Sequence, residues 1–500
     1  MYTLCYSLHL LDPYFMTLRD PRAVHALDLP EIRHRIAHHL LPRLSDLYSC
    51  MLVSRGWYLD FAGALWHTLG AREISILGKR DAERTALLNK YGRYVTVVET
   101  KSEVDFRTLQ HASIRNIKGL TVSLSETEGL MRELVSDLVR RCRRTLRRVN
   151  LQGPSVAGTA QGAHQQLQGA RSMYHFDINT LVPDMESGLE EVHIHNVGIT
   201  REGFSNFLRG ASNLRHLRLN NVCITTFNSG VELFTESRLR RLVCSVSQVM
   251  NPGKEQSLTA SATPGTSLLV HFPALQHWTV ESGPSSTEFS ALMQLHQAVI
   301  EYTPNLRNIQ INDANSYTLT ELLARVFVNL QTSSLQFSHF TSDALLSLLS
   351  HHSTLTRIQI QTRAVKTDAL RTESMRSTHL ILKTCAKLEV LSIRGYEVRI
   401  EELDVGEWAC RDVLRELRIV IMGFGKGHGD VCLKRLQKLR NERVLGRASR
   451  EAEATSAVEA DVEVGGSGVA DRVVRRLLPL KKLKIVCLGG KDYYLATTRH

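Results

Sequence analysis

Two groups of residues in this chain have types and spacings that could support chemistry. His193 and His195 are two residues apart, so on a strand their rings would share one face and could meet a ligand, although a polar, solvent-facing strand explains them more simply. Residues 423–429 carry glycine at alternate positions after an apolar segment. They lack the Gly-x-Gly-x-x-Gly spacing of a dinucleotide loop, and Lys426 has no Ser or Thr after it as in a P-loop, so we expect no phosphate site there.

The nine cysteines are scattered singly, and none has the Cys-x-x-Cys spacing of a metal or redox site. This pattern favours free thiols in a reducing compartment, and the lack of any Asn-x-Ser/Thr sequon agrees with it. No apolar run reaches the length of about 18 residues that crosses a bilayer, and residues 1–15 lack the basic segment of a signal peptide. We therefore expect a cytoplasmic and/or nuclear protein that is not an enzyme, with no catalytic residues, no metal, no cofactor and no membrane partner.

Length and charge narrow the classes of partner. With 500 residues, of which 43% are hydrophobic and 22% charged, the chain is long enough for about three domains or for one repeat array. The net charge of +12 favours acidic partners. Residues 140–148 hold six arginines, which could form a nuclear-import signal or a patch for an acidic partner, or could be the solvated end of a helix. Nucleic acid is not an expected partner, because no helix interleaves aromatic and basic residues.

One short pattern, apolar-x-x-apolar-x-apolar, recurs along most of the chain. Its copies begin at Ile117, Leu146, Leu189, Leu214, Leu239, Leu275, Leu306, Leu355, Leu388, Leu414 and Leu480, with a weak copy at Thr332, Leu335 and Phe337. Many copies are about 25 residues apart, and longer steps contain loop-like insertions near residues 153–172, 251–266 and 446–471. The last two apolar positions share one face of a strand, and helical stretches, one of them capped by Ser342 and Asp343, lie between copies. Each unit would be buried only by its neighbours.

This motif resembles the strand core of the leucine-rich repeat family over residues 116–490. The resemblance implies an α/β fold, an irregular leucine-rich-repeat solenoid with parallel strands on the concave face and helices outside. The asparagine that the family consensus places after the third apolar residue is mostly missing, and only Asn196 and Asn221 lie near such a place. We therefore expect irregular repeats. An unrelated α/β array, or a sandwich with leucine-rich strands, would carry the same strand pattern.

Residues 26–70 have a helical pattern instead. Apolar residues at every fourth position predict a first helix with Pro30 in its first turn, where proline is tolerated. Ser45 and Asp46 are candidate N-caps of a second helix, and Ser54 is the candidate N-cap of a third. Three helices this short bury little surface alone, so such a module needs a partner or a neighbouring domain.

The apolar residues of this module also follow a known motif in order and spacing. They are Leu29-Pro30-x-Ile32, Ile36, Leu40, Leu47, Val53-Ser54-Arg55-x-Trp57 and Leu65-Trp66. On these residues the module resembles an F-box, the family that binds the Skp-type adaptor of Skp–cullin–F-box ubiquitin ligases. The resemblance implies a set of adaptor-binding residues, namely Leu29, Pro30, Ile32, Leu47, Val53 and Trp57, and through the adaptor a cullin as a further partner. The same residues could form the module's own core, and both can hold at once.

An F-box followed by repeats is the order found in F-box proteins with leucine-rich repeats, so the resemblance covers most of the chain. It implies a substrate-recognition subunit of a ligase, which binds a protein target through its repeats. A leucine-rich-repeat interaction scaffold without a ligase role is the alternative. Residues 1–25 are a poorly defined segment outside the resemblance. Residues 71–115 would connect the two parts, with a capping strand at residues 94–98.

The open face of the predicted sheet is the candidate target site. In each copy, the residues around the last two apolar positions would point to this face, and basic residues outnumber acidic ones among them. The candidate target-binding residues are Arg218, Arg241, Arg357, Arg394 and Arg418. Because guanidinium groups pair bidentately with oxyanions, we expect an acidic or phosphorylated segment in the target.

Overall fold

The chain forms two compact units in a computed structural model. The structure describes residues 27, 29–40, 43–70, 74, 81–112, 114–124, 128–154, 175–182, 188–225, 237–245, 249, 267–281, 289–314, 320–337, 341–362, 378–403, 406–421, 426–444, 467–488 and 491–495. The described residues up to Leu239 belong to the first unit, and those from Arg240 onward belong to the second. Residues 1–25 and most of the three predicted insertions lie outside the described residues. Helices and mostly parallel strands place the chain in the α/β class, as the sequence predicted.

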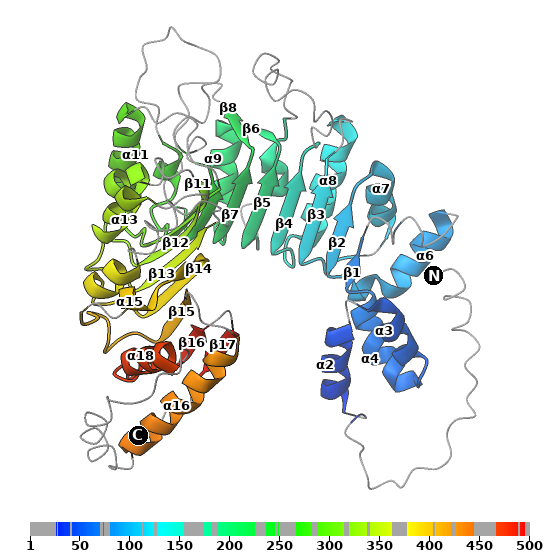
Figure 1. Cartoon of the computed structure of the whole chain (residues 1–500). Helices are drawn as coiled ribbons and strands as arrows, with labels where there is room; N and C mark the ends of the chain where they lie inside the picture. The colour runs from blue at the N-terminus through cyan, green and yellow to red at the C-terminus, as the bar shows by residue number, and fades with distance from the viewer. Residues whose placement is uncertain are drawn as a thin grey trace, which may run out of the picture. The chain divides into compact units, whose positions relative to one another are not determined.

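Three short helices begin the first unit (Figure 1). They are α2 (Pro30–Leu40), α3 (Leu44–Met51) and α4 (Arg55–Leu65). The predicted start of α4 is confirmed, because the Ser54 hydroxyl accepts a hydrogen bond from the Trp57 N–H at 3.3 Å. The predicted start of α3 is wrong by two residues. Its N-cap is Arg43, whose side chain makes no capping hydrogen bond, and Ser45 and Asp46 lie inside the first turn.

The core of this three-helix module is small. Five buried residues form it: Ala37, Leu47, Met51, Phe61 and Ala62. The Trp57 ring stacks on Phe61 with centroids 5.1 Å apart. Two contacts then connect the module to the following helix, since Trp66 stacks on Tyr91 at 4.7 Å and the Tyr58 and Tyr91 hydroxyls lie 2.8 Å apart.

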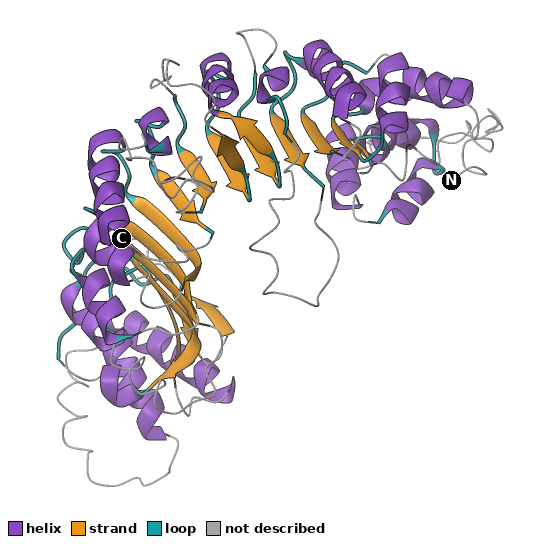
Figure 2. Cartoon of the chain, turned by 90° about the horizontal axis from the view of Figure 1, so that it is seen from above, coloured by secondary structure: helices purple, strands orange, loops and turns teal. Residues whose placement is uncertain are grey.

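The rest of the first unit is a parallel sheet with helices along one face. Its strands follow one another in chain order: β1 (Thr68–Leu69), β2 (Val97–Thr100), β3 (Gly119–Ser123), β4 (Arg148–Gln152), β5 (Glu191–His195) and β7 (His216–Asn220). A separate parallel pair joins β6 (Gly198–Thr200) to β8 (Cys223–Thr225). The helical segments are α6 (Asp81–Tyr91), η4 (Gly92–Tyr94), α7 (Glu103–His111), α8 (Glu128–Cys142), η5 (Ile178–Leu181) and α9 (Arg201–Gly210). Figures 1 and 2 show α7, α8 and α9 on the same face of the sheet.

The second unit repeats this arrangement. Its strands, again in chain order, are β9 (Arg241–Cys244), β10 (His277–Val280), β11 (Asn308–Ala314), β12 (Thr332–Phe337), β13 (Arg357–Thr362), β14 (Val390–Val398), β15 (Glu416–Ile421), β16 (Ile485–Leu488) and β17 (Lys491–Tyr494). They pair in parallel except for β17, which runs antiparallel to β16. The helical segments are η6 (Leu268–His271), α11 (Phe289–Tyr302), η7 (Leu322–Val326), α13 (Ser342–Leu349), α15 (Ile400–Leu403), α16 (Lys426–Val444) and α18 (Ser467–Leu477). The cap of α13 is Thr341, one residue before the predicted Ser342.

The recurring apolar motif fills the space between each sheet and its helices. Leu214, Leu217 and Leu219 are typical, since none of the three is more than 1% exposed. Neighbouring strands pair residue by residue, so that Leu217 lies opposite Val192 and Leu219 lies opposite Ile194. Equivalent positions of successive copies therefore line up across the sheet, and the residues between them form rows on the open face.

Asparagine ends two neighbouring strands of the first unit in the same way. Asn196 follows β5 and Asn221 follows β7, and both have left-handed backbone, with φ of 55° and 50°. The Asn221 side-chain amide donates to the Asn196 side-chain oxygen at 3.0 Å. Asparagine adopts this backbone more readily than most residues that carry a Cβ. These are the two asparagines that the sequence places near the consensus position.

The weak copy of the motif begins two residues earlier than the sequence predicted. It consists of Leu330, Ser333 and Leu335, because Ser333 pairs with Ile358 of the next strand and is fully buried. Within the described residues, the Ser333 hydroxyl has no hydrogen-bond partner. A buried serine in place of an aliphatic residue concealed this copy, and Thr332 belongs to the open face instead.

The last copy begins at Leu483 rather than at Leu480. Val486 lies opposite Leu417 on the neighbouring strand, so the second apolar position of this copy is Val486. Leu480 is also buried, in the turn before the strand. Leu480 and Leu483 each begin a match to the motif, and the prediction took the earlier of the two. Lys482 consequently lies in the turn and not on the sheet.

The parallel sheet of the first unit starts before the predicted boundary at residue 116. β1 and β2 already pair in parallel, and β2 pairs with β3. Val95, Val98 and Thr100 are an additional copy, each at most 1% exposed, in which a buried threonine replaces the third apolar residue. The segment 71–115 therefore contributes to the sheet as well as connecting two parts.

The asparagine pair yields a stability prediction. Asn221→Ala should lower the free energy of unfolding of the first unit by about 2 kcal/mol, because alanine loses a hydrogen bond and is strained at positive φ. Asn221→Gly should cost only about 1 kcal/mol, since glycine keeps the backbone freedom. The neighbouring Asn220→Ala is the control and should change stability by less than about 0.5 kcal/mol. Urea denaturation of the full chain measures all three, and equal losses for alanine and glycine would contradict the left-handed turn.

Candidate functional site

Apolar side chains are exposed where α2 and α4 begin. Leu29 is 41% exposed and Val53 is 64% exposed. The first turn of α2 lies against α4, because Arg33 Nε lies 2.8 Å from Asp60 Oδ2 in the middle of that helix. A Cβ on Gly56 would also lie 2.8 Å from the Arg33 guanidinium group, so glycine allows this close approach. Leu29 and Val53 precede the starts of these two helices, which come close to each other where Arg33 approaches Gly56.

Two further exposed residues extend this surface, Leu52 at 41% and Leu59 at 51%. Neither belongs to the residues that resemble the F-box motif. Leu59 lies two residues after Trp57 on α4, off the inner face of that helix, and this offset is the sequence signal that could have identified it. We refer to Leu29, Leu52, Val53 and Leu59 as the apolar surface of the module.

The six residues predicted to bind an adaptor differ in burial. The exposed ones are Leu29, Pro30 and Val53. Ile32 and Trp57 are half-buried, and Trp57 presents one ring face to Phe61. Leu47 is fully buried in the core of the module, which is the core position that the sequence also allowed for it.

The five arginines predicted to bind a target are divided between the two units. Arg218 lies in the first unit on β7 and is half-buried, whereas the other four lie in the second unit. Arg241 and Arg357 are exposed at the starts of β9 and β13. Arg394 and Arg418 are brought together, because both line one hollow on the open face of the sheet in the second unit.

This hollow extends over β11 to β15 and has a volume of about 310 Å³. Most of the side chains that line it are uncharged amides and hydroxyls, including Gln310, Ser334, Gln336, Gln359, Gln361 and Ser392. Its size is at the lower limit of about 300 Å³ for ligand pockets in general. The hollow can therefore offer many hydrogen bonds to a small or extended ligand but little apolar contact.

Arg418 is held by two carboxylates at one end of the hollow. Its Nε lies 2.5 Å from Glu416 Oε1, and its Nη1 lies 3.0 Å from Asp492 Oδ2. Desolvation works against the charged form, but the attraction of Glu416 and Asp492 prevails and raises the pKa of Arg418 above its ordinary value. The charge of Arg418 is thus already balanced inside the protein, which makes it a structural residue rather than the anchor for an anionic target.

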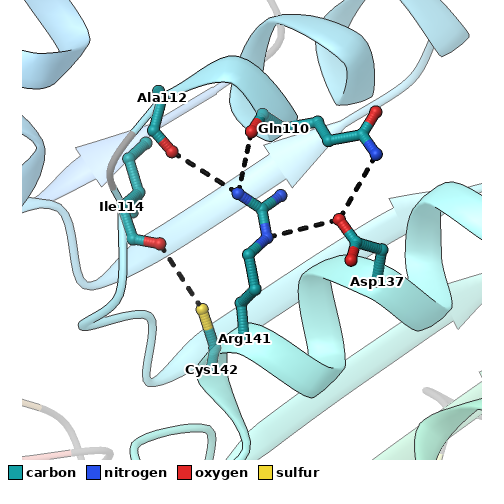
Figure 3. A network of polar contacts seen from close by, with 6 residues as sticks. All are labelled: Gln110, Ala112, Ile114, Asp137, Arg141 and Cys142. Carbon is teal, nitrogen blue, oxygen red and sulfur yellow. Dashed lines mark hydrogen bonds and ion pairs between the residues drawn. The ribbon is translucent and has the colours of Figure 1, made fainter.

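Arg141, from the run of six arginines, ties two helices of the first unit together (Figure 3). Its Nη1 donates to the Gln110 carbonyl at 2.9 Å and to the Ala112 carbonyl at 3.5 Å, and its Nε lies 3.3 Å from Asp137. The Gln110 side-chain amide donates to the same carboxylate at 3.3 Å. The network connects α7 to α8 across one repeat.

Other arginines of this run make contacts within the protein or are exposed to solvent. Arg147 donates to the Gly188 carbonyl at 2.9 Å and lies 3.5 Å from Glu190. Arg140, Arg144 and Arg148 are exposed. Residues 140–148 span the end of α8 and the start of β4, which is the helix-end arrangement among the interpretations that the sequence allowed.

The candidate histidines and the glycine of the described residues contact other side chains of the protein. His193 Nε2 lies 2.9 Å from Glu191 Oε1 on the same strand, and the His193 and His195 rings meet edge to face at 6.4 Å. Within the described residues, no group of three His, Cys, Asp or Glu side chains could hold a metal ion. Residues 423–425 lie outside the described part, and Gly429 on α16 is covered by the Tyr493 ring.

Several buried cysteines have thiols that are hard to ionise. Burial raises the pKa of Cys385 and Cys410 to about 12 and that of Cys432 to about 11. Burial also raises the pKa of the Cys244 thiol. Because the thiolate is the reactive form, these four side chains behave as small apolar residues at neutral pH.

No protein-family model matches this chain, and no curated protein matches it. Among the helices that the structure describes, none combines the length and the apolar character needed to cross a bilayer. The candidate functional sites of the described residues are therefore the two surfaces above, the apolar surface of the module and the polar hollow.

The contrast between Leu47 and Val53 leads to a prediction about the module. Leu47→Ala should destabilise the three helices by about 2–5 kcal/mol, because it removes a fully buried side chain from a small core. Val53→Ala should change stability by less than about 0.5 kcal/mol. Limited proteolysis of the full chain, with mass spectrometry of cuts within residues 30–65, measures the difference. Equal sensitivity of the two variants would refute the assignment of Val53 to the surface.

Proposed function

We propose that this chain is the substrate-recognition subunit of a Skp–cullin–F-box ubiquitin ligase. The three-helix module acts as an F-box that binds the Skp-type adaptor, and through it a cullin, while the repeat sheets bind a protein target. The observation that supports this most strongly is the exposure of Leu29 and Val53, which precede α2 and α4. Both residues belong to the motif that resembles an F-box.

The apolar surface of the module supports a protein partner on energetic grounds. Complete burial of a valine or leucine side chain contributes about 1.5–3 kcal/mol. A few such anchors supply most of the affinity of a typical interface. An adaptor that covers Leu29, Leu52, Val53 and Leu59 would remove this area from water and would also add to the small core of the module.

We further propose that the repeats form a leucine-rich-repeat solenoid with its strands on the concave face. Strands in chain order, helices along one face and the Asn196–Asn221 pair support this interpretation. Solenoids present long open sheet faces to protein ligands. The proposal places the chain in the cytoplasm and/or nucleus and assigns it no catalytic residue, metal or cofactor.

Proximity would be the contribution of such a subunit to ubiquitin transfer. A chain that binds adaptor and target together makes the encounter between the ubiquitin thioester and target lysines effectively intramolecular. Effective concentrations for short flexible connections are on the order of millimolar. This role requires two binding surfaces with different chemistry and no reactive side chain.

The alternative is an interaction scaffold in which the three helices only cap the first repeats. The contacts of Tyr91 with Trp66 and Tyr58 favour this second candidate, because they attach the module to the rest of the first unit. Adaptor binding distinguishes the two functions, since a cap would not need an exposed apolar surface.

The adaptor interface predicts the behaviour of a double variant. Leu29→Asp with Val53→Asp should weaken binding of a purified Skp-type adaptor at least about 100-fold, or about 2.7 kcal/mol, because two charges would have to be desolvated at the interface. The matched control is Leu346→Asp on α13, which is 62% exposed and lies in the second unit. Co-purification and calorimetry with the full chain measure both. Adaptor binding that survives the double substitution, or no adaptor binding by the unmodified chain, would refute the ligase role.

A further inference from the structure

Two rows of polar side chains line the hollow on the sheet of the second unit. In-register pairing aligns the first row across β11 to β14: Gln310, Ser334, Gln359 and Ser392. The second row lies two residues further along the strands: Gln336, Gln361 and Arg394. Neighbours within a row are about 4.8 Å apart, and the rows are about 6.6 Å apart at their Cα atoms.

The floor and the ends of the hollow are also defined. Leu335 and Ile360 contribute main chain to the lining, because their side chains are buried on the helix side of the sheet. At β11, the Gln310 amide donates to the Asn312 side-chain oxygen at 3.1 Å and links the two rows. At β15, the ion pair of Arg418 with Glu416 closes the other end. The open length is therefore that of about four strands, or about 14 Å.

The charge of the lining disfavours a strongly anionic ligand. Glu416 and Asp492 balance Arg418, and a second guanidinium group, that of the exposed Arg394, lines the hollow at the end of the second row. Phosphate recognition uses clustered guanidinium groups, and Glu416 would repel a second anion here. None of the lining residues is aromatic, so bases and sugar rings would find no stacking surface.

The two rows of polar side chains match the main chain of a polypeptide instead. Each glutamine side chain offers one acceptor oxygen and two donor hydrogens. The N–H and C=O groups of an extended chain point alternately to its two edges, where the two rows would meet them. About four extended residues span the open length, at about 3.4 Å each.

We infer that this hollow binds an extended, largely uncharged segment of a protein through its main chain, with one carboxylate of that segment at Arg394. This inference rests on the proposed function, and it specifies the class of target segment that the ligase subunit binds. Of the acidic or phosphorylated segment that the sequence predicted, it keeps the acidic alternative, with a single carboxylate.

An array of immobilised hexapeptides tests the inference, with the purified full chain as the probe and no adaptor present. The preferred sequence should contain one acidic position and no phosphoserine. N-methylation of alternate residues in that hexapeptide should weaken binding at least tenfold in fluorescence anisotropy, because it removes main-chain donors. This measurement uses the unmodified protein, so it does not depend on how any variant folds.

Substitutions of residues that line the hollow test the same inference. Gln336→Leu with Gln361→Leu should weaken the hexapeptide at least tenfold, and Arg394→Gln should abolish the preference for the acidic position. The controls are Gln297→Leu on α11 and Arg307→Gln in the turn before β11, both of which are exposed outside the hollow and should leave the affinity unchanged.

Three results would overturn the inference: no hexapeptide bound, binding insensitive to N-methylation and to the glutamine substitutions, or a preference for phosphoserine with steep salt dependence. The last result would identify an anion site. Because the adaptor is absent, failure of the array leaves the adaptor measurements intact, and failure of adaptor binding leaves the array result intact.

Discussion

Parallel, in-register pairing of the strands is the constraint on which the rest of this structure depends. A strand of four to six residues cannot bury its own apolar side chains, so each copy of the motif is buried by the copies on either side and by the helices along one face. The same pairing aligns the residues of the open face. Gln336 and Gln361 belong to different repeats, yet they lie opposite each other in one hollow because their strands share a register.

The three-helix module meets the same need to bury apolar surface in a different way. Its core of five buried residues leaves Leu29, Leu52, Val53 and Leu59 in contact with water. The Arg33–Asp60 ion pair joins the first turn of α2 to the middle of α4. The chain thus offers an apolar surface in the first unit and a polar hollow in the second, which suits two partners of different chemistry.

The sequence predicted most strands because their burial pattern is regular, and it was wrong where a buried polar residue broke the pattern. Ser333 and Thr100 occupy core positions, so their copies were displaced or missed. The candidate sites were harder to predict, because motif spacing cannot separate a core residue such as Leu47 from an exposed one such as Val53. Similarly, the partners of Arg418 include Asp492, which lies on another strand far along the chain.

Hydrogen exchange of the full chain, with and without a purified Skp-type adaptor, tests the central claim most directly. The account predicts that the adaptor slows exchange in residues 29–33 and 52–59, around the apolar surface, and leaves β11 to β15 unchanged. Unchanged exchange throughout α2 and α4 at saturating adaptor would contradict it. Protection confined to the second unit would contradict it equally.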